Sequence, residues 1–398
     1  MARERPRILG GLIRSTGDWE LAEDCLQDAT ERALSRWPRD GTPDNPAAWL
    51  TTTAQRRALD VLRRRQTEAE KVRQVAAELE PETAGTDPHG DFYRDDQLRL
   101  IFTCCHPALP LDGQVALTLK TVAGLSARQI AQAFLVSEAT MSQRLLRTRR
   151  KLAHAAIPFR VPEPHRIAER TAGVLAVIYL VFNEGYTSAA AGVDLAGEAV
   201  RLATLVARLL PDDDEAQSLE ALLLFQHSRH AARTDAGGEL VAMEDQDRGL
   251  WDRAMIDRGL AALAGAGRSG RAPGPYQLQA RIAAVHASAS GPGTTDWARI
   301  VASYDDLLAL HPSPVVALNR AVALAFRDGP GAGLAALDVV ASDALGGYPP
   351  LPAVRADLLR RAGRLTEAAT AYREAIGLAR SELDRQALER RLRECEPG

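Results

Sequence analysis

Cysteine is scarce in this chain of 398 residues, and its four cysteines form no pattern that predicts a disulfide framework. Cys104 and Cys105 are adjacent, so they lack the CxxC spacing of zinc ligands. The run Cys104-Cys105-His106 leaves open a metal cluster or buried thiols on a helix, and the missing second pair favours buried thiols. Unpaired cysteines are typical of a reducing compartment, so we expect a cytoplasmic protein that binds no metal.

Long apolar runs are missing as well. The longest, residues 173–182, is too short to cross a bilayer and indicates a buried helix. The charged residues Arg3, Glu4, Arg5 and Arg7 precede no apolar segment, so the sequence predicts no export signal. We therefore expect no membrane partner.

The residue patterns of a catalytic site are also lacking. The glycine-rich stretch 265–270 follows a helical pattern and has no lysine, so it is a linker and not a phosphate-binding loop. We find no paired acids in a cleft-forming pattern and no nucleophile beside a base. The sequence predicts a protein that is not an enzyme and that needs no cofactor.

Charge is unevenly distributed along the chain, although the net charge is only −3. Residues 56–65 hold five arginines against the single acid Asp60, and residues 78–96 are rich in acids. Basic islands in a nearly neutral chain indicate local contact with nucleic acid.

Residues 125–152 divide into two short helical patterns, because apolar residues recur at helical spacing on both sides of a break. Ser126 and Gln129 have the spacing of a capping box for the first helix, and Ser137 is a favoured N-cap for the second. The pattern predicts a helix-turn-helix whose second helix enters the major groove of DNA, with an ordinary helical hairpin as the alternative. The side chains placed to meet base edges are Thr140, Ser142, Gln143 and Arg144, and those placed to hold phosphates are Arg147, Arg149, Arg150 and Lys151.

An acidic helix and a basic helix flank a proline-rich loop near the N-terminus. The first helix is expected over residues 19–37, with Leu34 on its apolar face and acids on the opposite face. Prolines and a glycine interrupt the chain between 38 and 46, and the second helix is expected over 46–65. Trp49 beside hydroxyls and arginines suits single-stranded DNA, although a lone tryptophan on a helix is more often part of the core.

These segments resemble the motifs of bacterial extracytoplasmic-function sigma factors of the sigma-70 family. The resemblance lies in LAEDCLQDATERAL, PDNPAAWLTTTAQRRALDVLRRR and the helix-turn-helix ending RLLRTRRKL, in this order. FNEGYT at 182–187 and DQDRGLWDRAMI at 245–256 resemble the subgroup with a C-terminal tetratricopeptide-like extension. The resemblance covers nearly the whole chain; one departure is Leu135, which stands where the family's turn has glycine.

The resemblance implies core RNA polymerase, through its β and β′ subunits, and promoter DNA as partners. It places the contact with the clamp helices of the β′ subunit on Asp24, Gln27, Asp28 and Arg32. It places capture of the −10 element on Asn45, Trp49, Thr52, Arg56 and Arg57, followed by the arginine cluster with Arg63 and Arg64. It places the −35 element on Thr140, Ser142, Gln143, Arg144 and Arg147, followed by Arg149 and Arg150.

The second half of the chain indicates a helical extension. Around Trp251, the acids Asp245, Asp247 and Asp252 indicate a helix cap and a packed ring. Arg281, Arg320 and Arg355 recur in step, each followed by a second helical pattern, as in tetratricopeptide arrays; a non-repetitive helical domain is the alternative.

The predicted fold is all-α, with two small helical sigma domains, the second a helix-turn-helix, followed by a solenoid-like extension. The expected segments are a region 2-like domain at 1–65, an acidic linker at 66–97, a region 4-like domain at 98–160, a helical extension at 166–264 and helical repeats at 275–394. In the family the linker threads the polymerase channel, and a plain tether is the alternative.

The predicted function is promoter-specific transcription initiation with core polymerase, regulated by the extension. The extension is expected to act on a protein partner or on the chain itself. The alternative is a helix-turn-helix regulator with a helical sensor domain, which does not explain the pattern from Asp24 to Arg57.

Overall fold

The computed structural model describes residues 5–73, 91–134, 136–155, 157–187, 194–235, 237, 239–340, 348, 350–379 and 382–396. Every named element in these ranges is a helix, and the only sheet-like pairing within them is an isolated bridge between Thr234 and Leu240. The predicted all-α class is confirmed. Among the same residues, no helix has both the length and the apolar character that a membrane crossing requires.

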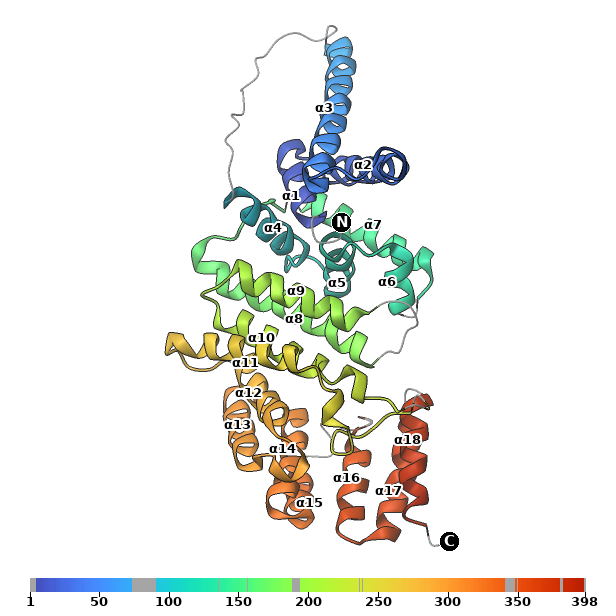
Figure 1. Cartoon of the computed structure of the whole chain (residues 1–398), viewed down its shortest axis with the longest axis vertical. Coiled ribbons are helices and arrows are strands. Elements are labelled where there is room, and N and C mark those ends of the chain that lie inside the picture. The colour runs from blue at the N-terminus through green and yellow to red at the C-terminus, as the bar shows by residue number, and fades with distance from the viewer. Residues whose placement is uncertain are drawn as a thin grey trace. The chain divides into compact units, whose positions relative to one another are not determined.

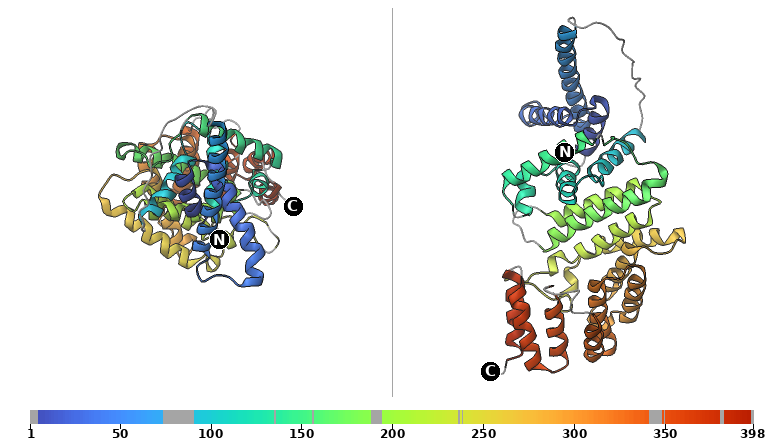
Figure 2. Two further views of the ribbon diagram at one scale, coloured as in Figure 1. Left: turned by 90° about the horizontal axis from the view of Figure 1, so that it is seen from above. Right: turned by 180° about the vertical axis from the view of Figure 1, so that it is seen from behind.

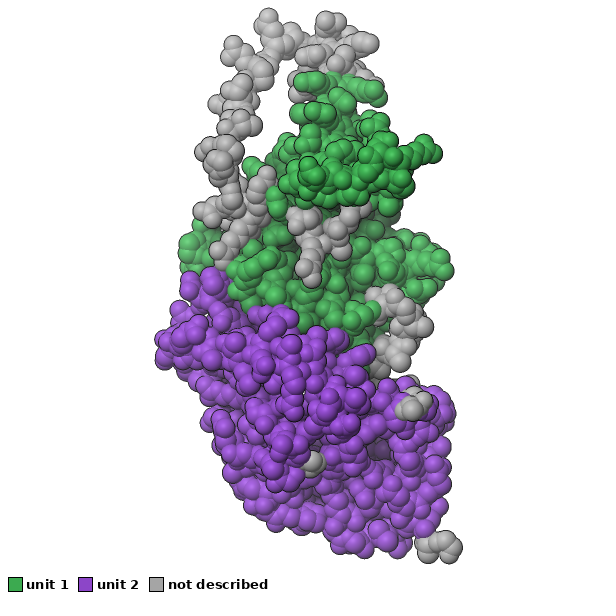
Figure 3. Space-filling view, in the orientation of Figure 1, with its two compact units in different colours: residues 1–209 green, residues 210–398 purple. Residues whose placement is uncertain are grey.

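The chain forms two compact units, residues 1–209 and 210–398 (Figure 3). The helices of the first unit are α1 (Arg5–Thr16), α2 (Trp19–Asp40), α3 (Pro46–Arg73), α4 (Asp91–Cys104), α5 (Leu111–Thr118), the π-helical turn η1 (Leu119–Ala123), α6 (Ala127–Ala133), α7 (Glu138–His154), α8 (Ile167–Thr187) and α9 (Leu195–Leu209), joined by one short 3-10 turn (Figure 1). The helices of the second unit are α10 (Asp214–His227), α11 (Arg253–Ala266), α12 (Pro275–Ser288), α13 (Trp297–Leu310), α14 (Pro314–Asp328), α15 (Pro330–Val339), α16 (Pro350–Arg361), α17 (Leu365–Leu378) and α18 (Glu382–Arg393).

Helix α2 begins at a side-chain cap and buries one face. Asp18 accepts a hydrogen bond from the Leu21 N–H at 3.0 Å, which satisfies one of the unpaired amides at the helix start. Leu26 and Ala33, seven residues apart, are buried. The prediction for Leu34 is wrong, because its side chain is 66% exposed and follows the exposed face of Gln27, seven residues earlier.

Helix α3 is longer than the sequence predicts, since it continues to Arg73 instead of ending at Arg65. The stretch after Arg65 has no proline or glycine before residue 81, so nothing in its composition ends the helix. The predicted linker at 66–97 therefore contains the end of α3 and the beginning of α4, and its residues 74–90 lie outside the described part of the chain.

Helices α8 and α9 lie side by side in the first unit (Figures 1 and 2) and pack against the helices that precede them. Arg170 of α8 donates a hydrogen bond to the Phe102 carbonyl at the end of α4, and Arg201 of α9 donates one to the Val122 carbonyl of η1 at 3.3 Å. The unit boundary thus falls within the segment 166–264 that the sequence groups as one extension.

The second unit contains the predicted helix pairs, in which α12, α14 and α16 are each followed by a second helix. Arg320 of α14 pairs with Asp305 of α13, and Arg355 of α16 pairs with Asp338 of α15 at 2.9 Å. Two of the three arginines that recur in step, Arg320 and Arg355, therefore join their repeat to the preceding helix. Small residues such as Ala321 and Ala356 are fully buried at the contacts, as expected for stacked helical repeats.

Candidate nucleic-acid interface

Both predicted caps of the helix-turn-helix are confirmed. Ser126 Oγ accepts a hydrogen bond from the Gln129 N–H at 3.1 Å, and Gln129 Oε1 accepts one from the Ser126 N–H at 2.9 Å. Ser137 Oγ accepts one from the Thr140 N–H at 3.1 Å, so α7 begins at the predicted residue. Leu135, which replaces the turn glycine, lies outside the described residues.

The apolar face of the motif fixes the orientation of α7. Ile130, Met141 and Leu145 are buried, and these are the residues whose spacing predicts the two helices. Gly113 of α5 approaches α7 so closely that an added Cβ would lie 2.6 Å from Thr148 Oγ1. The opposite face of α7 is consequently presented to solvent.

The predicted −35 residues are mostly on this outer face. Five of them are exposed: Thr140, Ser142, Gln143, Arg147 and Arg150. The other two are half-buried and ion-paired. Arg144 Nε lies 3.2 Å from Asp112 Oδ2 of α5, and Arg149 Nη2 donates a hydrogen bond to Glu23 Oε2 of α2.

The Glu23–Arg149 pair lies in a group of half-buried charges. Its side chains are only 11% and 23% exposed, respectively. Burial lowers the pKa of Lys120 below its ordinary value. The nearby Glu23 acts against this decrease, and the cations Arg5 and Arg149 add to it. Burial also lowers the pKa of Arg5, again opposed by Glu23. One carboxylate is thus close to three cations.

The predicted polymerase-contact residues lie along α2. Asp24, Gln27 and Arg32 are exposed, and Gln27 donates a hydrogen bond to Glu31 at 3.1 Å. Asp28 is half-buried, and its Oδ2 accepts a hydrogen bond from Arg57 Nε of α3 at 2.9 Å. An expected polymerase residue and an expected DNA residue are therefore bonded to each other.

The predicted −10 residues divide between structural and exposed positions. Asn45 Oδ1 accepts a hydrogen bond from the Ala48 N–H at 3.0 Å, so it caps α3. Trp49 is half-buried, and its ring meets the ring of Trp37 edge-on at a centroid distance of 5.6 Å. Four of the remaining residues are exposed: Thr52, Arg56, Arg63 and Arg64.

Two partners of candidate residues, Glu23 and Asp112, were missed in the sequence. Glu23 precedes Asp24 in the acidic run of α2, but Arg149 is 126 residues away, so no local pattern joins them. Asp112 stands in the first turn of α5, where an acid is ordinarily explained by the helix dipole. An excess of acids on α2 was the one signal available.

Cys104 and Cys105 are free and buried, which confirms their interpretation as buried thiols. Burial raises the pKa of Cys105 to about 11 and that of Cys104 well above its ordinary value. Within the described ranges no group of three or more His, Cys, Asp or Glu side chains is placed to hold a metal ion.

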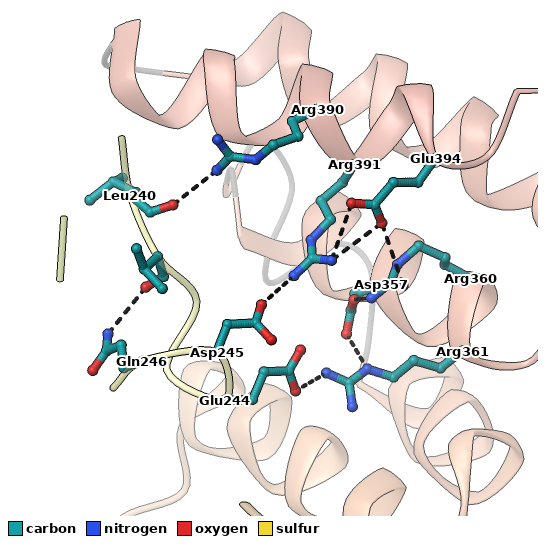
Figure 4. A network of polar contacts seen from close by, with 11 residues as sticks. Leu240, Glu244, Asp245, Gln246, Asp357, Arg360, Arg361, Arg390, Arg391 and Glu394 are labelled. Atoms are coloured by element: carbon teal, nitrogen blue, oxygen red, sulfur yellow. Dashed lines mark hydrogen bonds and ion pairs between the residues drawn. The ribbon is translucent and has the colours of Figure 1, made fainter. Parts of the chain in front are cut away.

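The extension has a polar network of its own, which joins the segment 239–252 to α16 and α18 (Figure 4). Asp245 accepts a hydrogen bond from Arg391 of α18 at 2.8 Å, and Glu244 accepts one from Arg361 of α16. Other contacts in the network run from Arg360 and Arg361 to Asp357, from Arg360 and Arg391 to Glu394, from Arg390 to the Leu240 carbonyl, and from Gln246 to the Val241 carbonyl.

The same segment is fixed at its other end. The Arg248 guanidinium lies over the Trp251 ring at 4.5 Å and donates to the carbonyls of His286, in the last turn of α12, and of Ala289, directly after it. Trp251 is buried and Asp252 caps α11, as predicted, whereas Asp245 is an ion-pair partner. The pKa of His286 falls to about 4 because of burial and the cations Arg229 and Arg248.

Comparison with known proteins agrees with this division of the chain. Residues 1–68 match Sigma-70 region 2, residues 99–152 match Sigma-70 region 4, and residues 170–267 match a family of unknown function, DUF6596. A probable ECF RNA polymerase sigma factor, SigI of Mycobacterium tuberculosis, is 31% identical over 161 residues, which are 40% of this chain and 55% of that protein.

The chain belongs to the extracytoplasmic-function sigma factors. This sigma factor acts in transcription initiation and carries a C-terminal extension that includes the DUF6596 match. An uncharacterized protein of Rhizobium meliloti is 48% identical over 383 residues, which are 94% of this chain and 90% of that protein, so the extension is shared. Sigma factors are not a class of enzymes, and the sigma domains imply core polymerase and promoter DNA as partners.

Proposed function

We propose that this sigma factor is a non-catalytic cytoplasmic protein that binds the β and β′ subunits through α2, opens the −10 element with α3 and reads the −35 element with α7. The observation that carries this assignment is exposure. On each of these helices, apolar residues at helical spacing are buried. Most of the polar residues assigned to the partner lie on the outer face. The extension regulates this activity.

The polymerase surface is the exposed side of α2. Asp24, Gln27 and Arg32 fall within about 140° of the helix circumference, so they line one side over about two turns. Leu34 extends this side with an exposed apolar group, which suits a helix of a partner better than it suits water. A coiled coil laid along α2 would contact an acid, an amide, an arginine and a leucine.

The −10 surface lies on α3. Thr52, Arg56 and Arg63 are exposed and lie on nearby faces of the helix, which suits a strand whose phosphates follow the arginines. Trp49 supports this surface from its contact with Trp37, and its half-buried ring has an open part for a base to stack upon. Asn45 contributes by capping the helix and so fixing where Trp49 stands.

The −35 surface lies on α7. Thr140, Ser142 and Gln143 are in the first turns of the helix, where a recognition helix meets base edges. Arg144 is held beside them by Asp112, which leaves its guanidinium partly open to solvent. Arg147 and Arg150 lie further along and are exposed, as phosphate contacts require.

The extension offers a surface for protein and not for DNA. Its arginines 360, 361, 390 and 391 are each engaged by carboxylates of the same unit, so they are not a bare basic patch for phosphate. Stacked helical repeats bind peptides or helices on their faces. The target we propose is the polymerase or a sensor protein, and tethering makes the sigma domains themselves a further target.

The test is reconstitution with core polymerase. Asp24→Ala should weaken binding to core and abolish most specific transcripts, whereas Glu20→Ala, an exposed acid of the same helix, should leave both unchanged. A helix-turn-helix regulator would bind its promoter fragment without core and would not respond to Asp24→Ala. That outcome would replace the proposed function by the alternative.

A further inference from the structure

An acidic segment of the second unit lies against two of its helices. Residues 239–247 form no helix. Each of three acids in this segment forms an ion pair with an arginine of α16 or α18, namely Glu239 with Arg390, Glu244 with Arg361 and Asp245 with Arg391. Figure 4 shows Glu244 and Asp245 pointing toward their arginines. The segment thus lies on the helices as a bound acidic peptide would.

Two of these arginines are held in place by acids of their own helices. Arg361 Nε donates a hydrogen bond to Asp357 Oδ2 at 2.6 Å, and its guanidinium lies 4.3 Å from the centre of the Phe326 ring. Arg391 Nη1 donates one to Glu394 at 3.2 Å. In both arginines a different nitrogen, Nη2, donates to the acidic segment. Because an ordered side chain loses less entropy when a carboxylate binds, these arginines form a preformed site for carboxylates.

The acidic segment is held less firmly than the residues that follow it. The side chains of Glu239, Glu244 and Asp245 are 45%, 25% and 56% exposed, and ion pairs at such exposure are worth little. Gln246 and Arg248 are buried, and Arg248 donates to two carbonyls at the end of α12. The acids can therefore leave the arginines while the chain stays anchored directly after them.

We propose that Arg361, Arg390 and Arg391, the carboxylate clamp, bind an extended acidic segment of a partner protein, and that residues 239–245 occupy this site until the partner displaces them. The inference deepens the proposed function on which it rests, because it gives the chemistry of the protein that the extension binds. The partner competes with a tethered segment whose effective concentration is on the order of millimolar, so it must offer carboxylates at a similar spacing.

Acids that remain on this surface favour a protein segment over nucleic acid. When residues 239–245 leave, Asp357 and Glu394 still pair with the arginines of α16 and α18. These acids would repel a bound strand, which carries one negative charge per about 3.4 Å. An extended peptide brings only a few carboxylates separated by uncharged residues, as residues 240–243 separate Glu239 from Glu244.

The experiment measures binding of a labelled peptide with the sequence of residues 239–247 to the full-length chain, by fluorescence anisotropy. The release variant carries Glu239→Gln, Glu244→Gln and Asp245→Asn, which remove the internal competitors. It should bind the peptide about 3- to 100-fold more tightly than the native chain does, because each exposed pair contributes about 1.4- to 5-fold. A peptide with the same three replacements should not bind measurably.

A charge-matched variant separates release from the change in net charge. Glu367→Gln, Glu382→Gln and Asp328→Asn also remove three acids that pair with arginines, but these pairs lie outside the acidic segment. This variant should bind the peptide as weakly as the native chain does. Arg390→Gln, added to the release variant, should weaken peptide binding, whereas Arg385→Gln, at an exposed position of the same helix, should not.

Three results would overturn the proposal: equal peptide affinity of the release variant and the charge-matched variant, equal affinity for the acidic and the neutralised peptide, or tighter binding of a single-stranded oligonucleotide than of the acidic peptide. Circular dichroism identifies a folding defect of the release variant. Hydrogen exchange of the native chain is then the second measurement. Excess acidic peptide should accelerate the exchange of the amides of residues 239–245, and unchanged exchange would contradict their displacement.

Failure of the proposed function gives a different result. If the release variant binds the peptide but truncation after Leu209 leaves transcription with core polymerase unchanged, the carboxylate clamp exists and the regulatory role of the extension is wrong. If the truncation changes transcription and no acidic peptide binds, the extension acts through another surface and only the carboxylate clamp is refuted.

Discussion

Replacing Gly10 by alanine should open the contact between α1 and α4. The added Cβ would lie 2.9 Å from the Asp96 carbonyl oxygen and 3.1 Å from the carbonyl carbon, which are backbone atoms that cannot turn away. Overpacking of this kind costs about 1 to 3 kcal/mol in the closed arrangement and nothing once α1 and α4 separate. The ratio of open to closed chain should rise about 5- to 140-fold.

Gly11→Ala is the matched control for this prediction. Alanine stabilises the helix by about 1 kcal/mol over glycine at either position, so this gain cancels in the comparison. At Gly11 the added Cβ would lie 3.7 Å from Asp96 Oδ2, an ordinary contact. Any difference between the variants therefore reports the contact with α4.

The assay is energy transfer between labels on α2 and α7 of the full-length chain. The native cysteines are buried, so Arg36→Cys and Ala153→Cys, both at exposed positions, accept the fluorophores selectively. Gly10→Ala should lower transfer efficiency and raise DNA binding without core. Equal efficiencies for Gly10→Ala and Gly11→Ala would refute the reasoning that this contact closes the first unit.

The remaining predictions concern single sites. Ser137→Ala removes the cap of α7 and should weaken −35 duplex binding about fivefold, from about 1 kcal/mol of lost capping, while Ser137→Asn restores it, as anisotropy would show. Arg144→Ala should lose discrimination between cognate and mutated −35 sequences, whereas Arg150→Ala should weaken both equally; equal losses for Arg144→Ala would exclude base readout. The pKa of His286 is about 4 in the folded chain against an ordinary 6.5, so the fold favours the neutral ring. The free energy of unfolding is therefore unaffected by this group above pH 6.5 and decreases as the pH falls toward 4. His286→Gln should reduce the change of the melting temperature over this pH range. Truncation after Leu209 should preserve −35 binding while changing promoter output, whereas truncation after Val161 also removes α8 and should weaken −35 binding, which a comparison of the two fragments measures.

Local signals in the sequence were sufficient for the helix-turn-helix. The caps at Ser126 and Ser137 depend on residues three positions away, so their spacing specifies them without knowledge of the rest of the fold. The recurrence of Arg320 and Arg355 likewise predicted the helix pairs. In the structure each of these arginines forms an ion pair with an acid of the adjacent helix.

Long-range packing was not accessible in the same way. The approach of Gly10 to Asp96 and the pairing of Glu23 with Arg149 join residues far apart in sequence, and no periodicity encodes them. Leu34 was wrongly predicted within a single helix. Its apolar character favoured the buried face, but its position around the helix is that of the exposed Gln27. The residue assignments at the three surfaces stay predictions that the variants above test.

In vitro transcription with core polymerase tests the central assignment most directly. Core plus the full-length chain should start discrete transcripts from a library of genomic promoter fragments, and the active fragments should share one pair of −35 and −10 sequences that core alone does not use. If the chain fails to bind core, or if core with and without the chain gives the same transcripts, the chain does not act as a sigma factor and the account is contradicted.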